Sequence, residues 1–301
     1  MLHHTCRYDP GKDGLVIYVF GDRQEGQKGY IQEAWDEFKY QFKREKNAVA
    51  LGLGDYGEWL RPSMRERVYS SLAKDDSARM QLDNLVTKSH DDIIKNMDFL
   101  EGKLIGLHEG HHNHTFLHGS STDQRLASAL KTTFLGWTAS SRIVVEKPYG
   151  EKTHGYVYTV VSTHGNANGR RVGASINWME QNIVAGFLAD QYIMGHGCKN
   201  ANFVPSERAA IRRVGAPGID RQLPRCLIVG GFARCYTNGW ESDYGERAGF
   251  TPQPIGWGII RLKIIRRKEL QLAKGVTAQR GDSRGTYTLA VEQVNVTPDI
   301  P

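Results

Sequence analysis

The stretch Leu15-Val-Ile-Tyr-Val-Phe20, followed directly by Gly21-Asp22, decides the fold of this chain. Six apolar residues in a row predict a strand that is buried on both faces, as in a parallel sheet covered by helices. The next segment, 31–46, carries its apolar residues at helical spacing and predicts an amphipathic helix. A buried strand followed by such a helix indicates an α/β fold.

The alternation of strand and helix continues along the chain. Helical patterns cover about 62–100, 122–131 and 177–188, and strands are expected at 47–53, 103–107, 142–145, 156–161, 191–194, 225–229 and 258–265. The first half therefore predicts a mainly parallel sheet. The later strands, which short turns separate, predict a second sheet that is mixed or antiparallel.

Composition places the chain among globular proteins. Its 301 residues are 40% hydrophobic and 24% charged, which excludes disordered, collagenous and coiled-coil classes and allows a substantial core. No internal repeat or low-complexity linker divides it. We expect a single domain over 1–301, with a core at about 15–268 and a polar, loosely attached extension at 274–301.

The lack of recognisable targeting signals and the pattern of the cysteines favour a cytoplasmic location. No apolar run approaches the ~20 residues of a membrane helix, so we expect no membrane partner. The first ten residues lack the charged-then-apolar order of a secretion signal. The four cysteines form no CxxC pair, which argues against a disulfide framework and a zinc ribbon.

The charge balance allows an anionic partner without demanding one. There are 39 Lys and Arg against 33 Asp and Glu, giving a net charge of +6. The basic charge is spread out except at 261–268, where a strand with a solvated basic face is the simpler interpretation. Nucleic acid stays open as a partner.

Polar residues gather where five predicted strands end. Because ligands of open α/β sheets bind beyond the carboxyl ends of the strands, we expect these residues to converge. A Gly-Asp pair alone is more often a turn, so the prediction depends on all five positions together. Carboxylates, imidazoles and one thiol suit a divalent metal. The residues in question are Asp22, Gln24, Asp55, His111 or a neighbour, His164, His196 and Cys198.

The order of these blocks resembles the calcineurin-like metallophosphoesterase superfamily, whose pattern runs Asp-x-His, Gly-Asp, Gly-Asn-His-Asp/Glu, His and Gly-His-x-His. The resemblance covers about 15–200 and extends to about 268, and 230–260 resembles the phage and prophage branch. It implies a two-sheet α/β sandwich with the metal site at the carboxyl ends of the strands. The matching blocks are Gly21-Asp22-Arg-Gln24, Gly54-Asp55, Gly110-His-His-Asn113, Thr163-His164-Gly165 and Gly195-His196-Gly-Cys198.

The resemblance implies two metal sites that share Asp55. Asp22, Gln24 and Cys198 would complete one, and His111, His164 and His196 the other. Gln24 and Cys198 replace family histidines, and His111 replaces an asparagine. An amide is a poor substitute for imidazole, and Cys198 binds only as thiolate. We therefore expect one firmly held divalent ion, of manganese, zinc or iron, and a second that is weak or unusual.

The third block allows two registers. Gly110-His111-His112-Asn113 keeps the glycine at the strand end, whereas Asn113-His114 preserves the family dipeptide but shifts it by two residues. We favour the first, because the glycine then follows the strand directly. An HNH nuclease would need a ββα hairpin, which nothing around Leu104 or Thr115 resembles.

The implied activity is hydrolysis of a phosphomonoester or phosphodiester by metal-activated water, with Asp55 and His112 as catalytic residues. His112 would donate a proton to the departing oxygen. Family enzymes pair this histidine with a carboxylate that Asn113 cannot supply, so Asp22 or Glu109 is the expected partner. Candidate phosphate contacts, with solvated loop charges as the alternative, are Arg23, Arg170 and Arg171.

Two other interpretations stay open. A degenerate member of the superfamily would bind metal or nucleic acid without turnover, as three altered ligand positions suggest. A purely structural α/β protein would leave the strand-end histidines unexplained. Monoesters, cyclic nucleotides, nucleic-acid ends and phospholipid-like diesters all fit the superfamily, and the positive charge favours nucleotides or DNA.

Overall fold

The computed structural model describes most of the chain. The described residues are 1–59, 68–71, 75–149, 152–166, 169, 171–197, 199–211, 219–236, 244–247, 249, 251–266, 277–281 and 287–299.

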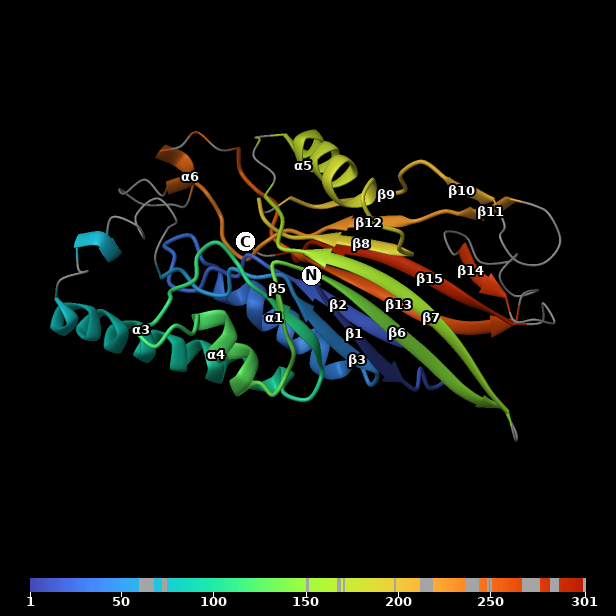
Figure 1. Cartoon of the computed structure of the whole chain (residues 1–301), viewed down its shortest axis with the longest axis horizontal. Coiled ribbons are helices and arrows are strands. Elements are labelled where there is room, and N and C mark those ends of the chain that lie inside the picture. Colours follow the sequence, from blue (N-terminus) through green and yellow to red (C-terminus); the bar gives the residue numbers. More distant parts are fainter. Residues whose placement is uncertain are drawn as a thin grey trace.

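Two sheets form the centre of the molecule, and the predicted α/β sandwich is confirmed (Figure 1). The seven-stranded sheet runs β14-β15-β13-β2-β3-β4-β5. Its strands β2 to β5 are mutually parallel, as expected, and β13 joins β2 antiparallel. The bounds are β2 Leu15–Phe20, β3 Ala48–Gly52, β4 Leu104–His108, β5 Phe134–Gly136, β13 Trp257–Arg266, β14 Thr277–Gly281 and β15 Tyr287–Val296.

The second sheet is mixed and runs β1-β6-β7-β8-β12-β9. Strand β7 pairs antiparallel with β6 and parallel with β8, so it turns its carboxyl end toward the same edge as β8. The strands are β1 Leu2–Tyr8, β6 Thr138–Tyr149, β7 Lys152–Thr163, β8 Gln191–Met194, β9 Ala201–Phe203 and β12 Arg225–Ile228, and β10 Arg208–Ile211 and β11 Ile219–Gln222 form a separate hairpin.

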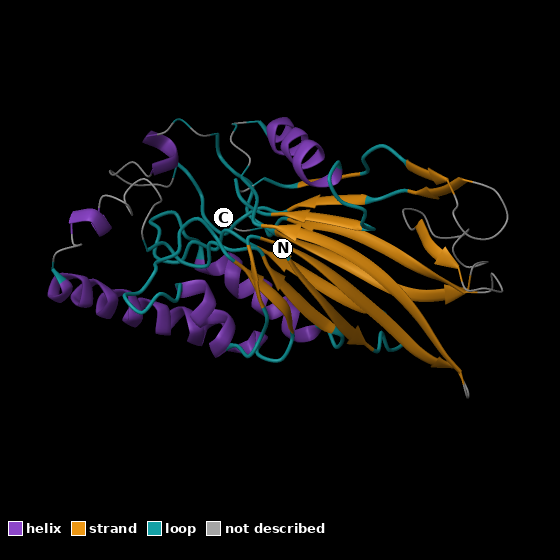
Figure 2. Ribbon diagram, viewed as in Figure 1, coloured by secondary structure: helices purple, strands orange, loops and turns teal. Residues whose placement is uncertain are grey.

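Helices cover the outer faces of the two sheets (Figure 2). Helix α1 (Gln32–Arg44) buries Trp35, Phe38 and Phe42 against the seven-stranded sheet, where Tyr18 and Phe20 of β2 meet their rings. Helices α3 (Asp76–Met97) and α4 (Thr122–Ala129), with a 3-10 turn at Asp98–Leu100, lie on the same side of this sheet as α1 in Figure 1. The short helix α6 is Tyr244–Arg247. Helix α5 (Val172–Met179) and a π-helix (Glu180–Val184) cover the other sheet. A hydrophobic core made of side chains from both sheets lies between them.

Some elements differ from the sequence prediction. The extension is not loosely attached at 287–296, because β15 pairs with β13 over ten residues and buries Leu289 and Val291 in the core. Strand β1 was not predicted, since only alternate residues face the core. Helix α5 begins at Val172, five residues before the expected start. Of the expected helical region 62–100, residues 62–67 and 72–74 lie outside the described residues.

The carboxyl ends of the strands meet at one edge. The loop after β2 runs beside the loop after β3, where the N–H of Gln24 donates to the carbonyl of Asp55 at 2.9 Å. The N–H of His164, after β7, donates to the carbonyl of Trp137, after β5, at 3.1 Å. Loops from both sheets therefore build one site. Among the described residues, no helix has the length and apolar character needed to cross a membrane.

Candidate metal centre

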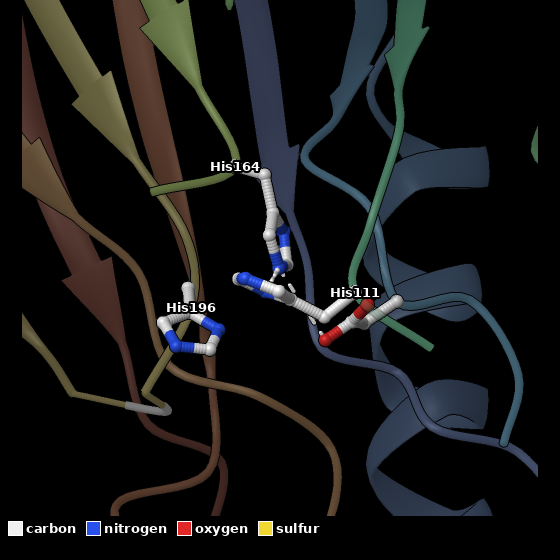
Figure 3. Close-up of side chains that lie close together, drawn as sticks. His111, His164 and His196 are labelled. Carbon is white, nitrogen blue, oxygen red and sulfur yellow. Dashed lines mark hydrogen bonds and ion pairs between the residues drawn. The ribbon is translucent and has the colours of Figure 1, made fainter. Parts of the chain in front are cut away.

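Four side chains from four different strand ends gather at this edge. They are Asp55 after β3, His111 after β4, His164 after β7 and His196 after β8. One potential ligand atom of each lies within 4.8 Å of those of the other three. Figure 3 shows the three histidine rings turned toward one another. The set matches the four residues expected around one metal ion.

Asp55 carries the negative charge of the cluster. Its side chain is 1% exposed, with Oδ2 3.4 Å from Nε2 of His164. Its Oδ1 accepts a hydrogen bond of 2.9 Å from the backbone N–H of His112. Burial opposes the charge, but His164 and His112 outweigh it and hold the pKa of Asp55 well below its usual range. The carboxylate is therefore ionised and ready to bind a cation.

His164 is oriented by the backbone behind it. Its Nδ1 lies 2.6 Å from the carbonyl oxygen of Leu53, which can only accept, so Nδ1 carries the hydrogen. Nε2 then faces the cluster, 2.9 Å from Nδ1 of His111. Such a second hydrogen bond is how proteins fix a metal-binding histidine. Burial alone would lower the pKa of His164, but Asp55 raises it to about 9.

His111 and His196 complete the cluster. Their centroids lie 4.3 Å apart. Burial and the neighbouring imidazoles of His164 and His111 lower the pKa of His196 to about 3. Trp137, which the sequence did not single out, sets its ring edge-on to His111 at 4.5 Å. Three imidazoles and one carboxylate suit zinc, iron or manganese, so the group could hold one divalent ion.

His112 stands beside the cluster and contacts an unexpected carboxylate. Its Nδ1 is 2.7 Å from Oε2 of Glu58, and its Nε2 is 4.0 Å from Oδ2 of Asp55. Burial opposes protonation, but Glu58 and Asp55 raise the pKa of His112 above its ordinary value. Glu109 does not take this part, because its Oε1 accepts from the Asn113 amide at 3.0 Å. Glu58 follows Asp55 by three residues, a spacing that alone did not reveal it.

The structure describes two of the three residues that were expected to complete the other metal position. Asp22 is 1% exposed, and its N–H donates to the carbonyl of Gly54 at 3.1 Å, which sets it beside the Asp55 loop. Gln24 is half-buried on the same loop. Cys198 lies outside the described residues. Within the part of the chain that the structure describes, no second group of three or more ligand side chains gathers.

Backbone conformation is unusual at this edge. Among the described residues other than glycine, six have a positive φ, and four of them belong to the predicted metal positions. Such a conformation is costly for a residue with a Cβ and concentrates at functional sites. The four are Asp22 (45°), Gln24 (48°), Asp55 (56°) and His196 (50°).

Of the three candidate arginines, the structure describes two, and these two lie in different surroundings. Arg23 is fully buried, with its guanidinium 4.4 Å from the centre of the Trp35 ring and paired with Glu25, so it does not reach a substrate. It anchors the Asp22 loop to α1 instead. Arg171 is exposed at the start of α5, and Arg170 lies outside the described residues.

The other histidines of the run 108–114 have structural partners. His114 is buried between Asp83 of α3, at 2.7 Å, and the Tyr69 hydroxyl, at 2.9 Å. The register with His111 and His112 at the site is therefore the one that the structure shows. His108 lies between the sheets, with Nε2 2.7 Å from Ser162 Oγ, and burial lowers its pKa to about 4.

One further carboxyl supports the His111 loop. Asp123, at the start of α4, is 1% exposed and accepts the N–H of Gly110 at 2.8 Å. Burial raises the pKa of Asp123 to about 7, although the Gly110 N–H opposes the rise. The sequence offered no sign of this contact, because Asp123 reads as an ordinary first-turn helix residue.

No family model matches the sequence, and no curated protein matches it. Among solved structures, Vps29 from Chaetomium thermophilum matches with a TM-score of 0.37 and 10% identity, over 94% of this chain and 97% of that one. The calcineurin-like phosphoesterase YfkN from Bacillus subtilis matches with a TM-score of 0.36 and 13% identity, over 95% and 91%. At these values the likeness says nothing about the function of this chain.

Proposed function

We propose that this chain is a metal-dependent phosphoesterase that hydrolyses a phosphodiester or phosphomonoester, with a nucleotide or DNA as the favoured substrate. The observation that carries the proposal is the convergence of Asp55, His111, His164 and His196 from four strand ends. Buried ligands of this kind, held by a hydrogen bond from behind, are costly to maintain without a cation. The sequence resemblance to the calcineurin-like metallophosphoesterases, and to their phage branch, supports the same reaction class.

Each residue of the site has a different role in the proposed reaction. A bound divalent ion polarises a phosphoryl oxygen and lowers the pKa of water. Asp55 supplies the negative charge that attracts the ion, and the Leu53 carbonyl holds the His164 ring in the binding orientation. We assign the transfer of a proton to the leaving oxygen to His112, whose Nε2 lies 4.0 Å from Oδ2 of Asp55. Arg171, exposed on the loop after β7, is a proposed phosphate contact, and Asp22, Gln24 and Cys198 are proposed ligands of a second, weaker ion.

A second function is kept because one observation favours it. Two of the ligands expected at the second ion position, Gln24 and Cys198, replace histidines of the family pattern. A chain with a single ion and no turnover would be a metal- or nucleic-acid-binding protein that has lost the reaction.

The test combines metal content with activity. Protein purified without chelator is analysed for bound metal, and hydrolysis of bis(4-nitrophenyl) phosphate is followed with added manganese, zinc or iron. We expect at least one ion per chain and turnover that Asp55→Asn abolishes. Turnover that survives in Asp55→Asn would come from elsewhere. Bound metal with no turnover under any condition would favour the binding protein.

A further inference from the structure

We propose that His108 and Ser162 form a bridge between the two sheets that sets the distance between the metal ligands, and with it the affinity for the ion. Both are positioning residues, because neither belongs to the group of four candidate ligands. The inference rests on the proposed function in one respect, since it requires that these four residues bind a divalent ion.

The candidate metal centre takes its ligands equally from the two sheets. Asp55 and His111 follow β3 and β4 of the seven-stranded sheet, whereas His164 and His196 follow β7 and β8 of the six-stranded sheet. The rings of His111 and His164, one from each sheet, face one another in Figure 3, with Nδ1 of the first 2.9 Å from Nε2 of the second. Any change in the spacing of the sheets at this edge therefore moves the ligands relative to one another.

His108 crosses the space between the sheets close to this edge. It is the last residue of β4, and it is fully buried. Its Nδ1 lies 2.8 Å from the carbonyl oxygen of Gly136 at the end of β5, and its Nε2 lies 2.7 Å from Oγ of Ser162 on β7. A carbonyl can only accept, so Nδ1 carries the hydrogen and Nε2 accepts from the Ser162 hydroxyl. Both ring nitrogens are therefore paired, and the orientation of the ring is fixed.

The bridge joins the two strand ends that carry His111 and His164. His108 precedes His111 by three residues, and Ser162 precedes His164 by two. The carbonyl of His108 also accepts a hydrogen bond of 3.1 Å from the hydroxyl of Tyr56, on the loop after β3. Three strand ends that supply ligands are thus tied together at His108.

A hydrogen-bonded bridge defines a spacing better than an apolar contact does. A pair of apolar side chains of the same shape can replace a buried hydrogen-bonded pair at little cost in stability. Apolar contacts tolerate small shifts, however, whereas a hydrogen bond has a narrow range of length and angle. A functional site needs its side chains held to within about 0.5 Å. The polar pair therefore serves the geometry of the site more than the stability of the core.

A second histidine on the same strand interface offers a matched control. Nε2 of His4, on β1, lies 3.2 Å from the carbonyl oxygen of Ile105 on β4, and its Nδ1 lies 3.3 Å from Oγ of Ser141 on β6. A histidine and a serine thus link the sheets here too, but Ile105 precedes His108 by three residues and lies about 10 Å farther from the strand end. Loss of the control contact should lower stability without affecting the ion.

The experiment compares Ser162→Ala with Ser141→Ala, each of which removes one hydroxyl from a buried histidine contact. The Kd for zinc and for cobalt is measured by competition with a chromogenic chelator, on protein that a urea titration shows to be folded. For Ser162→Ala we expect Kd to rise about 10-fold for both ions. For Ser141→Ala we expect Kd to change less than about 2-fold, because distant sites without shared partners act independently.

Two further readouts separate positioning from a general loss of structure. The absorption spectrum of bound cobalt depends on ligand geometry, so it should change in Ser162→Ala and not in Ser141→Ala. His108→Leu should also raise Kd, and adding Ser162→Ala to His108→Leu should raise it no further, because the bridge is already lost.

The outcomes distinguish the bridge from the reaction. An unchanged Kd in Ser162→Ala, or an equal rise in Ser141→Ala, would overturn the role of the bridge while leaving the phosphoesterase intact. A wild type that binds the ions but cleaves no phosphoester overturns the proposed function, and the Kd values still decide the role of the bridge. A wild type that binds neither ion overturns both.

Discussion

Gly110 lies directly against Asp55. A Cβ at position 110 would stand 2.1 Å from both the backbone nitrogen and Oδ1 of Asp55, far inside van der Waals contact. The strand end that carries His111 and His112 can therefore approach the Asp55 loop only because position 110 has no side chain. The candidate metal site depends on this close approach of two backbones.

Gly110→Ala is expected to separate the two loops. The added methyl group should lower the free energy of unfolding by about 1–3 kcal/mol and weaken metal binding, because His111 moves away from Asp55. Denaturation and calorimetric metal titration measure the two effects. Gly173→Ala is the control, since a Cβ there meets nothing within 4 Å. Normal metal affinity in Gly110→Ala would contradict the prediction.

Binding of a divalent ion is expected to stabilise the folded chain, and more so at high pH. An ion at 100 times its Kd adds about 2.7 kcal/mol to the free energy of unfolding. The pKa of His164 is raised to about 9, so below that pH a proton competes for the ring, and affinity should rise as pH increases from 6 to 9. Thermal melts with and without manganese or zinc measure the shift, which Asp55→Asn should remove.

The raised pKa of Asp123 predicts that the stability of the metal-free protein depends on pH. Its carboxyl has a pKa of about 7 when folded against an ordinary value of 3.8, so the folded chain binds this proton more tightly. The group's contribution to stability is complete below about pH 4 and is lost as pH rises through 7. Asp123→Asn keeps an acceptor for Gly110 and should remove this loss. Its stability relative to wild type, measured in urea at pH 5 and pH 8, should therefore be greater at pH 8.

Arg23→Met should affect folding and not substrate affinity. The change removes the buried partner of Glu25, a loss of about 3 kcal/mol in the free energy of unfolding. Arg171→Met, at an exposed position, should change stability by less than about 0.5 kcal/mol. A raised KM in Arg23→Met, with normal stability, would show that Arg23 meets the substrate after all.

The variant His114→Gln tests which register of the 110–114 segment supplies the metal-binding histidine. His114 contacts Asp83 and Tyr69, so its loss should loosen the attachment of α3 and lower the melting temperature while leaving the metal content unchanged. His111→Gln should do the reverse, with reduced metal content and a near-normal melting temperature in chelator. Elemental analysis of both variants measures the difference.

The sequence predicted those parts of the molecule that follow from hydrophobic runs. Leu15–Phe20 and Gln191–Met194 are buried throughout, so their ends, and the polar residues after them, could be located. Strand β15 escaped prediction because polar residues, such as Thr288 and Glu292, interrupt its apolar ones, although the strand buries Thr288 as well as Leu289 and Val291.

Side-chain direction could not be predicted in the same way. Arg23 stands between Asp22 and Gln24, whose positive φ values turn it inward toward Trp35. Glu58 meets His112 only because the loops after β3 and β4 lie side by side. Both outcomes depend on backbone angles and on contacts between distant segments, which residue type and spacing do not encode.

The place of β13 in the sheet has a consequence for biosynthesis. Strand β2, which leads to Asp22, has β3 on one edge and β13 on the other. At ordinary elongation rates, β13 leaves the ribosome on the order of ten or more seconds after β2. Until then β2 presents an open, apolar edge, and the loop after it has no finished sheet beneath it. The nascent chain therefore completes its candidate metal site late, only after β13 has joined β2.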